Sequence, residues 1–374
     1  MEREKNEVRS ITYFYRMTNP AKGWQQLLKI KGAVIGMVII VVSLATGILA
    51  YWLAPDPTPF ANRMIIEIGG QKPGFSQQFF LLPKEAAPAP VSFLERTVAG
   101  RPDRFQFIPI TGFTLTGDSI TISKFIDDGV TERISYPLSV IEDSPSKHFI
   151  TQVFHLGTDR YGRDILSRLI IGVRVSLLVG GIAMFLSLTI GLLLGAIAGY
   201  YGGKWDDIIM WFINVIWSVP TLLLVFAITL LLGKGFWQVF VAVGLTMWVN
   251  VARIVRGQLI AIRHIEYVEA ARALGYSDLR IIFKHILPNI IGPVLVVAAA
   301  NFASAIVIEA GLSFLGVGVQ PPQPSWGGMI KENYNFIITN NPMLALAPGF
   351  AIMLLVLAFN LLGNGIRDAL DVKN

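Results

Sequence analysis

The chain has 374 residues, of which 53% are hydrophobic and only 15% are charged. This composition is too apolar for an ordinary soluble domain and is typical of a polytopic membrane protein. The absence of cysteine excludes disulfides, thiolate metal sites and cysteine nucleophiles. The net charge of +6 does not indicate nucleic-acid binding, because the basic residues cluster beside apolar runs.

The amino-terminal segment, residues 1–32, is polar and basic, and the apolar run over residues 33–53 is long enough to cross a membrane once. The polar segment is too long for the first part of a signal peptide, so we interpret the run as an uncleaved anchor. Basic residues next to a span favour the cytoplasmic side. We therefore expect a cytoplasmic amino terminus followed by a first transmembrane helix.

Residues 54–150 contain no apolar run of span length and are expected to lie outside the membrane, as an extracytoplasmic insert. Short β-branched and aromatic runs, such as FQFIPI and TGFTLTGDSITISKFI, are separated by Gly, Asp and Pro and predict a small β-rich fold. The charges of the insert nearly cancel, which gives no sign of a nucleic-acid or lipid-binding patch. Its role stays open between a solvated spacer and a docking domain for a partner.

Residues 151–172 begin polar and end apolar. An apolar helical face that starts at Ile165 lies opposite Asp164, Ser167 and Arg168. This pattern predicts an amphipathic helix that lies at the membrane interface before the chain enters the bilayer.

Five further apolar runs give six spans in total and a five-helix core over residues 173–366; the runs cover residues 173–200, 208–232, 236–255, 288–315 and 344–366. The two short outer loops are poor in Lys and Arg, whereas the inner loops and both ends are rich in them. This asymmetry places both termini, including the tail at 367–374, in the cytoplasm. The predicted fold class is an all-α polytopic membrane protein with a β-rich insert between helices 1 and 2.

Few polar side chains lie within the spans, and the candidates for a translocation path are Asn214, Asn250, Asn301 and Glu309. An ionisable group in a span is costly, so Glu309 is a functional candidate, although a hydrogen bond or salt bridge near a helix end would also satisfy it. Pro220 predicts a helix kink. Close helix packing is predicted by the ladder of Gly191, Gly195 and Gly199.

The longest charged interruption of the core, residues 262–287, predicts two short cytoplasmic helices joined at Gly275. An apolar stripe on the first helix consists of Ile265, Val268, Ala271 and Leu274. A left-handed Gly275 would end this helix. Ser277 is the expected cap of the second helix, and Pro288 is expected to open the next span.

This segment resembles the EAA loop of permease subunits from ATP-binding-cassette (ABC) importers, through Glu269, Ala270, Ala271 and Gly275 and the later pair Leu287 and Pro288. His285 takes the place of the usual isoleucine, a form similar to the peptide-permease branch. Two stretches, LGTDRYGRDILSRLIIGVRVSLLVG and EAGLSFLGVGVQPPQPSWGGMI, resemble the C-type subunits of dipeptide and oligopeptide permeases. Asn364 departs from that pattern, in which aspartate is usual.

The resemblance implies a type I importer permease in the bacterial cytoplasmic (inner) membrane. Its implied partners are a second homologous permease subunit, two cytoplasmic ABC ATPases and an extracytoplasmic substrate-binding protein. ATP and Mg²⁺ would be bound by the ATPases, because this chain has no G-x-x-x-x-G-K-[ST] motif, and no cofactor or metal is expected here. The residues implied to couple to the ATPases are Glu269, Ala270, Ala271, Arg272, Gly275 and Tyr276. The implied cargo is a di- or oligopeptide, with nickel chelates, glutathione and oligosaccharides as alternatives.

Two other classes of function have weaker support. An intramembrane enzyme lacks a visible site, because all four histidines lie outside the predicted spans and neither H-E-x-x-H nor G-x-S-x-G occurs. A membrane scaffold that signals through the insert would need no ATPase. For residues 262–287, the alternative is an amphipathic helix resting on anionic lipid, which its acidic residues disfavour.

Overall fold

The computed structural model describes residues 20–86, 88–141, 145–338 and 341–370. They form two compact units. The helical unit holds the described residues of Met1–Ser43, Leu177–Leu312 and Ile352–Asn374, and the mixed unit holds those of Leu44–Ser176 and Ser313–Ala351. The first part of the predicted segment 1–32 and the end of the tail 367–374 lie outside the described residues.

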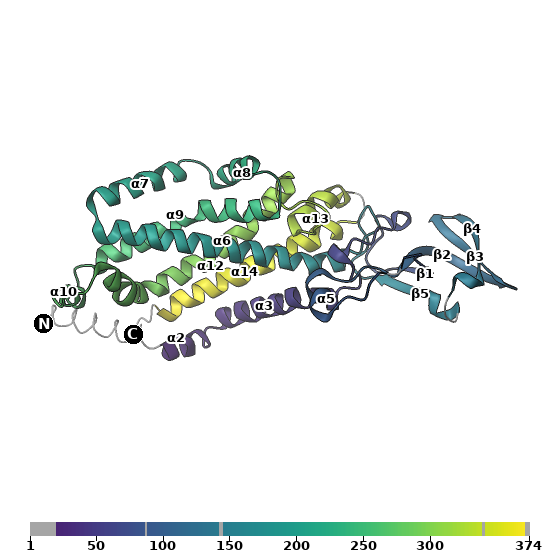
Figure 1. The fold of residues 1–374 in the computed structure, drawn as a ribbon, viewed down its shortest axis with the longest axis horizontal. Coiled ribbons are helices and arrows are strands. Elements are labelled where there is room, and N and C mark those ends of the chain that lie inside the picture. Colours follow the sequence, from purple (N-terminus) through teal and green to yellow (C-terminus); the bar gives the residue numbers. More distant parts are fainter. Residues whose placement is uncertain (1–19, 87, 142–144, 339–340, 371–374) are drawn as a thin grey trace. The chain divides into compact units, whose positions relative to one another are not determined.

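Five described helices are long and apolar enough to cross a membrane. They lie in the segments α3 (Lys31–Ile48), α6 (Ile165–Tyr201), α9 (Phe236–Ile262), α12 (Leu287–Leu315, with the helical turns from Asp278) and α14 (Met343–Leu370). A largely helical protein with several candidate membrane spans is therefore confirmed. Figure 1 shows α6, α9 and α12 running side by side in the helical unit.

The run predicted to form one helix over residues 208–232 is a broken pair, α7 (Gly203–Trp217) and α8 (Thr221–Leu232), bent by 92°. The break falls at Pro220, the residue before α8. Proline has no N–H for an i→i−4 bond, and it also disfavours a helical conformation in the residue before it. The pair makes a sixth span only if it is counted as one.

The glycine ladder of α6 packs closely on α9, as predicted. A Cβ added at Gly191 would lie 2.8 Å from the Trp248 carbonyl oxygen, and one at Gly195 would lie 2.5 Å from that of Ala252. Contacts this short leave no room for a side chain. The helices α6 and α9 therefore meet backbone to backbone along this face.

The mixed unit contains a five-stranded antiparallel sheet in the order β4-β3-β2-β1-β5. The strands are β1 (Phe75–Pro83), β2 (Phe105–Thr116), β3 (Ser119–Asp127), β4 (Val130–Pro137) and β5 (Phe149–Phe154). Successive side chains of a strand point to opposite faces, and the buried Phe79 and Phe80 accordingly belong to two separate apolar clusters. The predicted β-rich fold is confirmed, and β5 runs past residue 150, where the insert was expected to end.

The structure differs from the predicted interfacial helix over residues 151–172. This range contains the end of β5, a turn and the first residues of α6. Asp164, Ser167 and Arg168, which were expected to face water, are all buried. Their helical face was identified correctly, but it packs into a network of charges instead of facing solvent.

That network joins the start of α6 to α13 (Trp326–Asn333) within the mixed unit. The buried Arg163 guanidinium lies 2.6 Å from a carboxylate oxygen of Asp159 and 2.6 Å from one of Glu332. Arg168 lies farther from the same two carboxylates, at 3.9 and 3.7 Å. Asp159 also accepts the backbone N–H of Arg163 at 3.0 Å. The two short pairs give the Arg163 charge the partners that burial requires, whereas the buried Nε and Nη1 atoms of Arg168 have no hydrogen-bond partner among the described residues.

Candidate functional site

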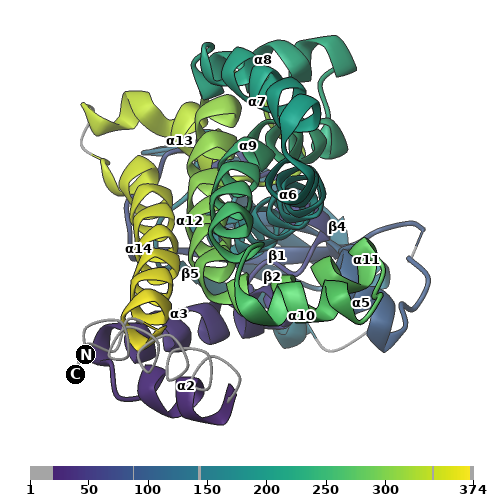
Figure 2. The same cartoon turned by 90° about the vertical axis from the view of Figure 1, so that its left-hand side faces the viewer.

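The charged segment over residues 262–287 forms a helix–turn–helix at one end of the helical unit (Figure 2). Its first helix is α10 (Glu266–Ala273). Gly275 follows with φ +76°, and two backbone bonds close the turn, from Gly275 N–H to the Arg272 carbonyl and from Tyr276 N–H to the Ala271 carbonyl, at 3.0 and 3.2 Å. This is a Schellman motif, and the predicted left-handed glycine is confirmed.

The second helix differs from the prediction. It begins at α11 (Asp278–Arg280) and continues through a π-helical stretch, Ile281–Ile286, directly into α12. Leu287 N–H bonds to the Ile282 carbonyl, five residues back. Pro288 therefore lies inside a continuous helical segment and does not open it. Ser277 occupies the N-cap position, but its side chain makes no capping bond.

The buried face of the helix–turn–helix packs on the ends of α6 and α9. Val268 and Ala271 from α10 join an apolar cluster with the isoleucines at 281, 282 and 286 and with Val255 and Leu259 of α9. The predicted apolar stripe is correct only in its middle, because Ile265 and Leu274 are exposed. Ala271, which was both part of the predicted stripe and one of the residues implied to couple to the ATPases, fills the interior of this cluster.

Polar contacts hold the turn to α6. The Tyr200 hydroxyl donates a hydrogen bond to Asp278 Oδ1 at 2.7 Å. Arg272 donates to the Tyr200 oxygen at 3.5 Å, and this bond raises the pKa of the arginine. On the other side, the Tyr276 ring stacks on His285 at 5.7 Å, and the Arg280 guanidinium lies 4.0 Å from the Tyr276 ring centre.

The outer face of the helix–turn–helix combines acidic, basic and apolar groups. Glu269, Ala270 and Arg272 are exposed along α10. Three large apolar side chains are exposed beside them, namely Leu274, Leu279 and Phe283. Leu279 and Phe283 were not among the predicted coupling residues. The sequence could have identified both as outer-face residues, because they fall outside the apolar face formed by the three isoleucines.

The four polar candidates in the apolar helices occupy different surroundings. Asn301 is buried in α12 and donates hydrogen bonds to the Ser187 hydroxyl at 3.2 Å and to the Met247 carbonyl at 3.3 Å. Glu309 is fully buried on the same helix. Asn214 on α7 and Asn250 on α9 are exposed. Asn301 thus bonds to both α6 and α9.

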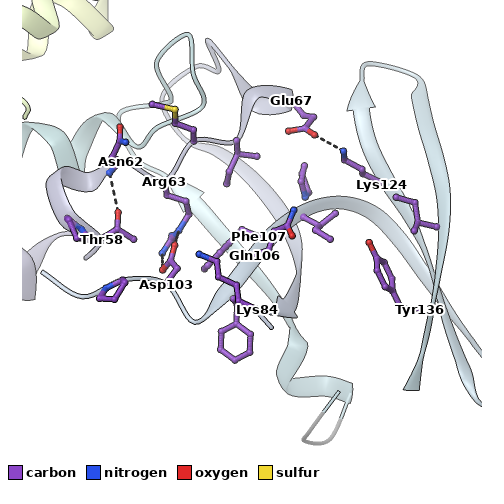
Figure 3. Close-up of a pocket in the computed structure, with 18 residues that line it drawn as sticks. Thr58, Asn62, Arg63, Glu67, Lys84, Asp103, Gln106, Phe107, Lys124 and Tyr136 are labelled. Carbon is purple, nitrogen blue, oxygen red and sulfur yellow. Dashed lines mark hydrogen bonds and ion pairs between the residues drawn. The ribbon is translucent and has the colours of Figure 1, made fainter. Parts of the chain in front are cut away.

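The mixed unit contains a cavity of about 530 Å³ beside its sheet (Figure 3). Its walls carry two ion pairs, Arg63 with Asp103 at 2.6 Å and Lys124 with Glu67 at 2.8 Å. The Arg63 guanidinium also lies 3.7 Å from the Phe107 ring centre. The bond to Glu67 raises the pKa of Lys124. These pairs join residues far apart in the chain and were not predictable from sequence.

Residues 191–373, which include the whole helix–turn–helix, match the family model of the binding-protein-dependent transport system inner membrane component. A glutathione transport system permease protein from Pectobacterium atrosepticum is 43% identical over 218 residues, covering 58% of this chain and 72% of its own. A dipeptide transport system permease protein from Alkalihalophilus pseudofirmus is 40% identical over 256 residues, covering 68% and 84%. The chain belongs to this family of transport permeases. An oligopeptide transport system permease protein from Haemophilus influenzae is 43% identical over 218 residues, covering 58% and 70%.

This membership confirms the resemblance on which the sequence analysis relied. The protein is a permease subunit of an ABC importer, a membrane component of a transport system rather than an enzyme. The helix–turn–helix is the largest charged element within the matched region.

Proposed function

We propose that this permease subunit imports di- or oligopeptides and that its helix–turn–helix receives the work of ATP hydrolysis. The peptide cargo is supported by the names of two relatives, an oligopeptide and a dipeptide permease. A glutathione permease is equally similar, and glutathione is the principal alternative. Nickel chelates and oligosaccharides are further alternatives, although none of the relatives described above is named for either cargo.

The proposed partners are a second homologous permease subunit, two cytoplasmic ABC ATPases that bind ATP and Mg²⁺, and an extracytoplasmic substrate-binding protein. The proposed location is the bacterial inner membrane, with both termini and the helix–turn–helix in the cytoplasm and the β-rich insert outside. The excess of Lys and Arg in the inner loops supports this topology. Counting α7 and α8 as one span gives the six spans that the topology requires.

The observation that carries the coupling proposal is the absence of a break between the second short helix and α12. Helical structure continues from Asp278 to Leu315, while α10 is fixed to it by the Schellman turn and by the buried apolar cluster. A force applied to α10 therefore moves the end of α12 with it. Such rigid-body movement of a helix is one way in which closure of a partner can be transmitted to the spans.

Each residue of the proposed coupling site has a defined part. Glu269 and Arg272 offer charges to an ATPase surface, and Ala270 lets that surface approach closely. Ala271 packs the inner face, and Gly275 sets the angle between the helices. Tyr276 stacks on His285 and so holds the turn to the second helix. Alternating access is the proposed output.

The path of the substrate remains a separate proposal. Asn214 and Asn250 are exposed on the helices and are candidates to face a path formed with the second permease. Asn301 is proposed to act in helix packing, because its amide bonds to two neighbouring helices. Glu309 is proposed as a path residue because it is an ionisable group at depth in an apolar helix.

Two experiments test these proposals. Uptake of labelled di- and tripeptides, including glutathione, is compared between a strain carrying the gene and a deletion strain, and unchanged peptide uptake in the deletion would refute the cargo. For coupling, Glu269→Lys should reduce copurification of the ATPases from detergent, whereas Glu132→Lys on β4 provides a matched exposed control. Equal copurification of both variants would refute the coupling site.

A further inference from the structure

A short helix in the insert, α5 (Phe93–Ala99), exposes three large apolar side chains. Phe93, Leu94 and Val98 are 67%, 74% and 72% exposed. At 100° per residue they fall within one arc of the helix, with Glu95 outside it. Ser92 and Glu95 form a capping box at the start of the helix, so the sequence specifies a helix here despite its short length.

The carboxyl end of α5 is tied to the first apolar helix by a single guanidinium. Arg174 donates hydrogen bonds to the carbonyls of Gly47 and Ile48 at 2.6 and 3.0 Å. It also donates to the carbonyls of Thr97 and Val98. The Gly47 and Ile48 carbonyls lie at the end of α3. They lack intrahelical partners because the helix is interrupted at Leu49.

These hydrogen bonds of Arg174 fix the position of α5 along the axis of the first span. Gly47 and Ile48 lie inside the apolar run that continues to Leu53. At a rise of about 1.5 Å per residue, five residues place the end of α5 roughly 7 Å before the end of that run. The helix therefore lies beside the last turns of the span and not beyond them.

The side chains around this level are those of a membrane boundary. Trp52 donates its indole N–H to the Thr97 hydroxyl at 3.0 Å and packs on Phe93 with 5.2 Å between ring centres. The Arg96 guanidinium lies 3.7 Å from the centre of the Trp52 ring. Tryptophan and arginine are favoured where apolar chains meet headgroups.

We propose that α5 is a membrane anchor of the insert, lying in the boundary between headgroups and acyl chains with Leu94 and Val98 immersed in lipid. Lipid fits this surface better than a protein, because three side chains are far fewer than the 20–30 residues a side of a stable protein interface. The exposed apolar surface also continues onto the span itself through Ile48 and Leu53. Seven residues bind a membrane weakly alone, but the guanidinium tie and the adjoining span keep α5 at this depth.

An anchored α5 restricts where the insert can move. The chain reaches the sheet through β2 soon after α5 ends, and Gly100 at that end packs against Tyr51, where an added Cβ would lie 2.8 Å from the ring. The insert is thus held to the span by the covalent connection after Leu53, by the helix α5 and by the hydrogen bond from Phe60 N–H to the Tyr51 hydroxyl at 3.1 Å. The side of the membrane on which the insert lies depends on the topology proposed above. The contact of α5 with lipid does not depend on that topology.

The chain has no cysteine, so a single introduced cysteine carries a single spin label in the full-length protein. Leu94→Cys and Val98→Cys test the anchor in lipid vesicles, Ile48→Cys (62% exposed on the span) is the lipid control, and Leu115→Cys (54% exposed on β2) is the water control. The measurement is the ratio of collisions with oxygen, which enriches in lipid, to collisions with a water-soluble nickel chelate. Each variant must retain wild-type yield and helical content.

We expect the ratio at residues 94 and 98 to exceed that at residue 115 several-fold and to approach that at residue 48. A ratio equal to that at residue 115 overturns the proposal, because α5 would then lie in water. Few collisions with either reagent also overturn it, because a protein partner would then cover α5. A wrong topology gives a different result: the lipid ratio stays high, while an impermeant thiol reagent reaches Leu115→Cys only from the cytoplasmic side.

Discussion

The turn of the proposed coupling site makes a sharp prediction at Gly275, because the effect of its left-handed backbone can be separated from steric effects. The residue has φ +76°, and a Cβ added there would meet no atom within 4 Å. A substitution therefore adds backbone strain without a steric clash. For an L-residue the left-handed conformation costs about 1–2 kcal/mol, with β-branched residues at the upper end and asparagine well below it.

A cost of about 1–2 kcal/mol reduces the population of the closed turn roughly 5–30-fold relative to the open one. We therefore expect the uptake achieved per ATP hydrolysed to fall in the order Gly275→Asn, Gly275→Ala, Gly275→Val, with asparagine close to wild type. Membrane insertion should be unchanged, since the strain is local. The assay is uptake and ATP hydrolysis measured together in vesicles containing the assembled transporter.

The matched control is Gly257→Val in α9. An added Cβ there also meets nothing within 4 Å, but the backbone is helical, so valine should couple as wild type does. Hydrogen exchange provides a direct reading of the turn, because the Tyr276 amide is bonded to the Ala271 carbonyl only while the turn is closed. If Gly275→Val couples normally, or if Gly275→Asn is as damaging as valine, the reasoning from backbone strain is refuted.

Three further predictions concern stability. Arg163→Ala removes a buried partner of two carboxylates and should lower the free energy of unfolding, measured by thermal unfolding, by about 3–5 kcal/mol. The exposed pair of Arg367 with Asp368 should contribute no more than about 1 kcal/mol. Equal effects would contradict the role of burial. Gly195→Leu should disrupt the contact of α6 with α9 and reduce folded yield, while Gly349→Leu, with open space around it, should not. Burial raises the pKa of Asp164, so the folded state binds its proton more readily than the unfolded state, and the stabilising contribution is lost as pH rises through the raised pKa. The unfolding midpoint of Asp164→Asn minus that of wild type should therefore increase from pH 4 to 7, and a difference that falls over this range would refute the assignment.

Local patterns in the sequence determined the class of the protein and the centre of its candidate site. Apolar runs of span length and basic loops identified a polytopic membrane protein, and alternating β-branched runs identified the insert. The glycine between two amphipathic segments predicted the turn at Gly275. These features were predictable because each depends on residues close together in the sequence, within one span, one strand or one turn.

Tertiary structure decided what each face contacts. Helical spacing placed Asp164, Ser167 and Arg168 on one face, but only the fold brings Glu332 to that face and turns an expected solvent-facing surface into a buried network of charges. In the same way, Ile265 and Leu274 of the predicted apolar stripe became exposed because α6 and α9 cover only its middle. Pro288 became part of a continuous helix through the π-helical stretch before it. A sequence pattern states which residues share a surface, whereas the partner of that surface comes from distant parts of the chain that only folding brings together.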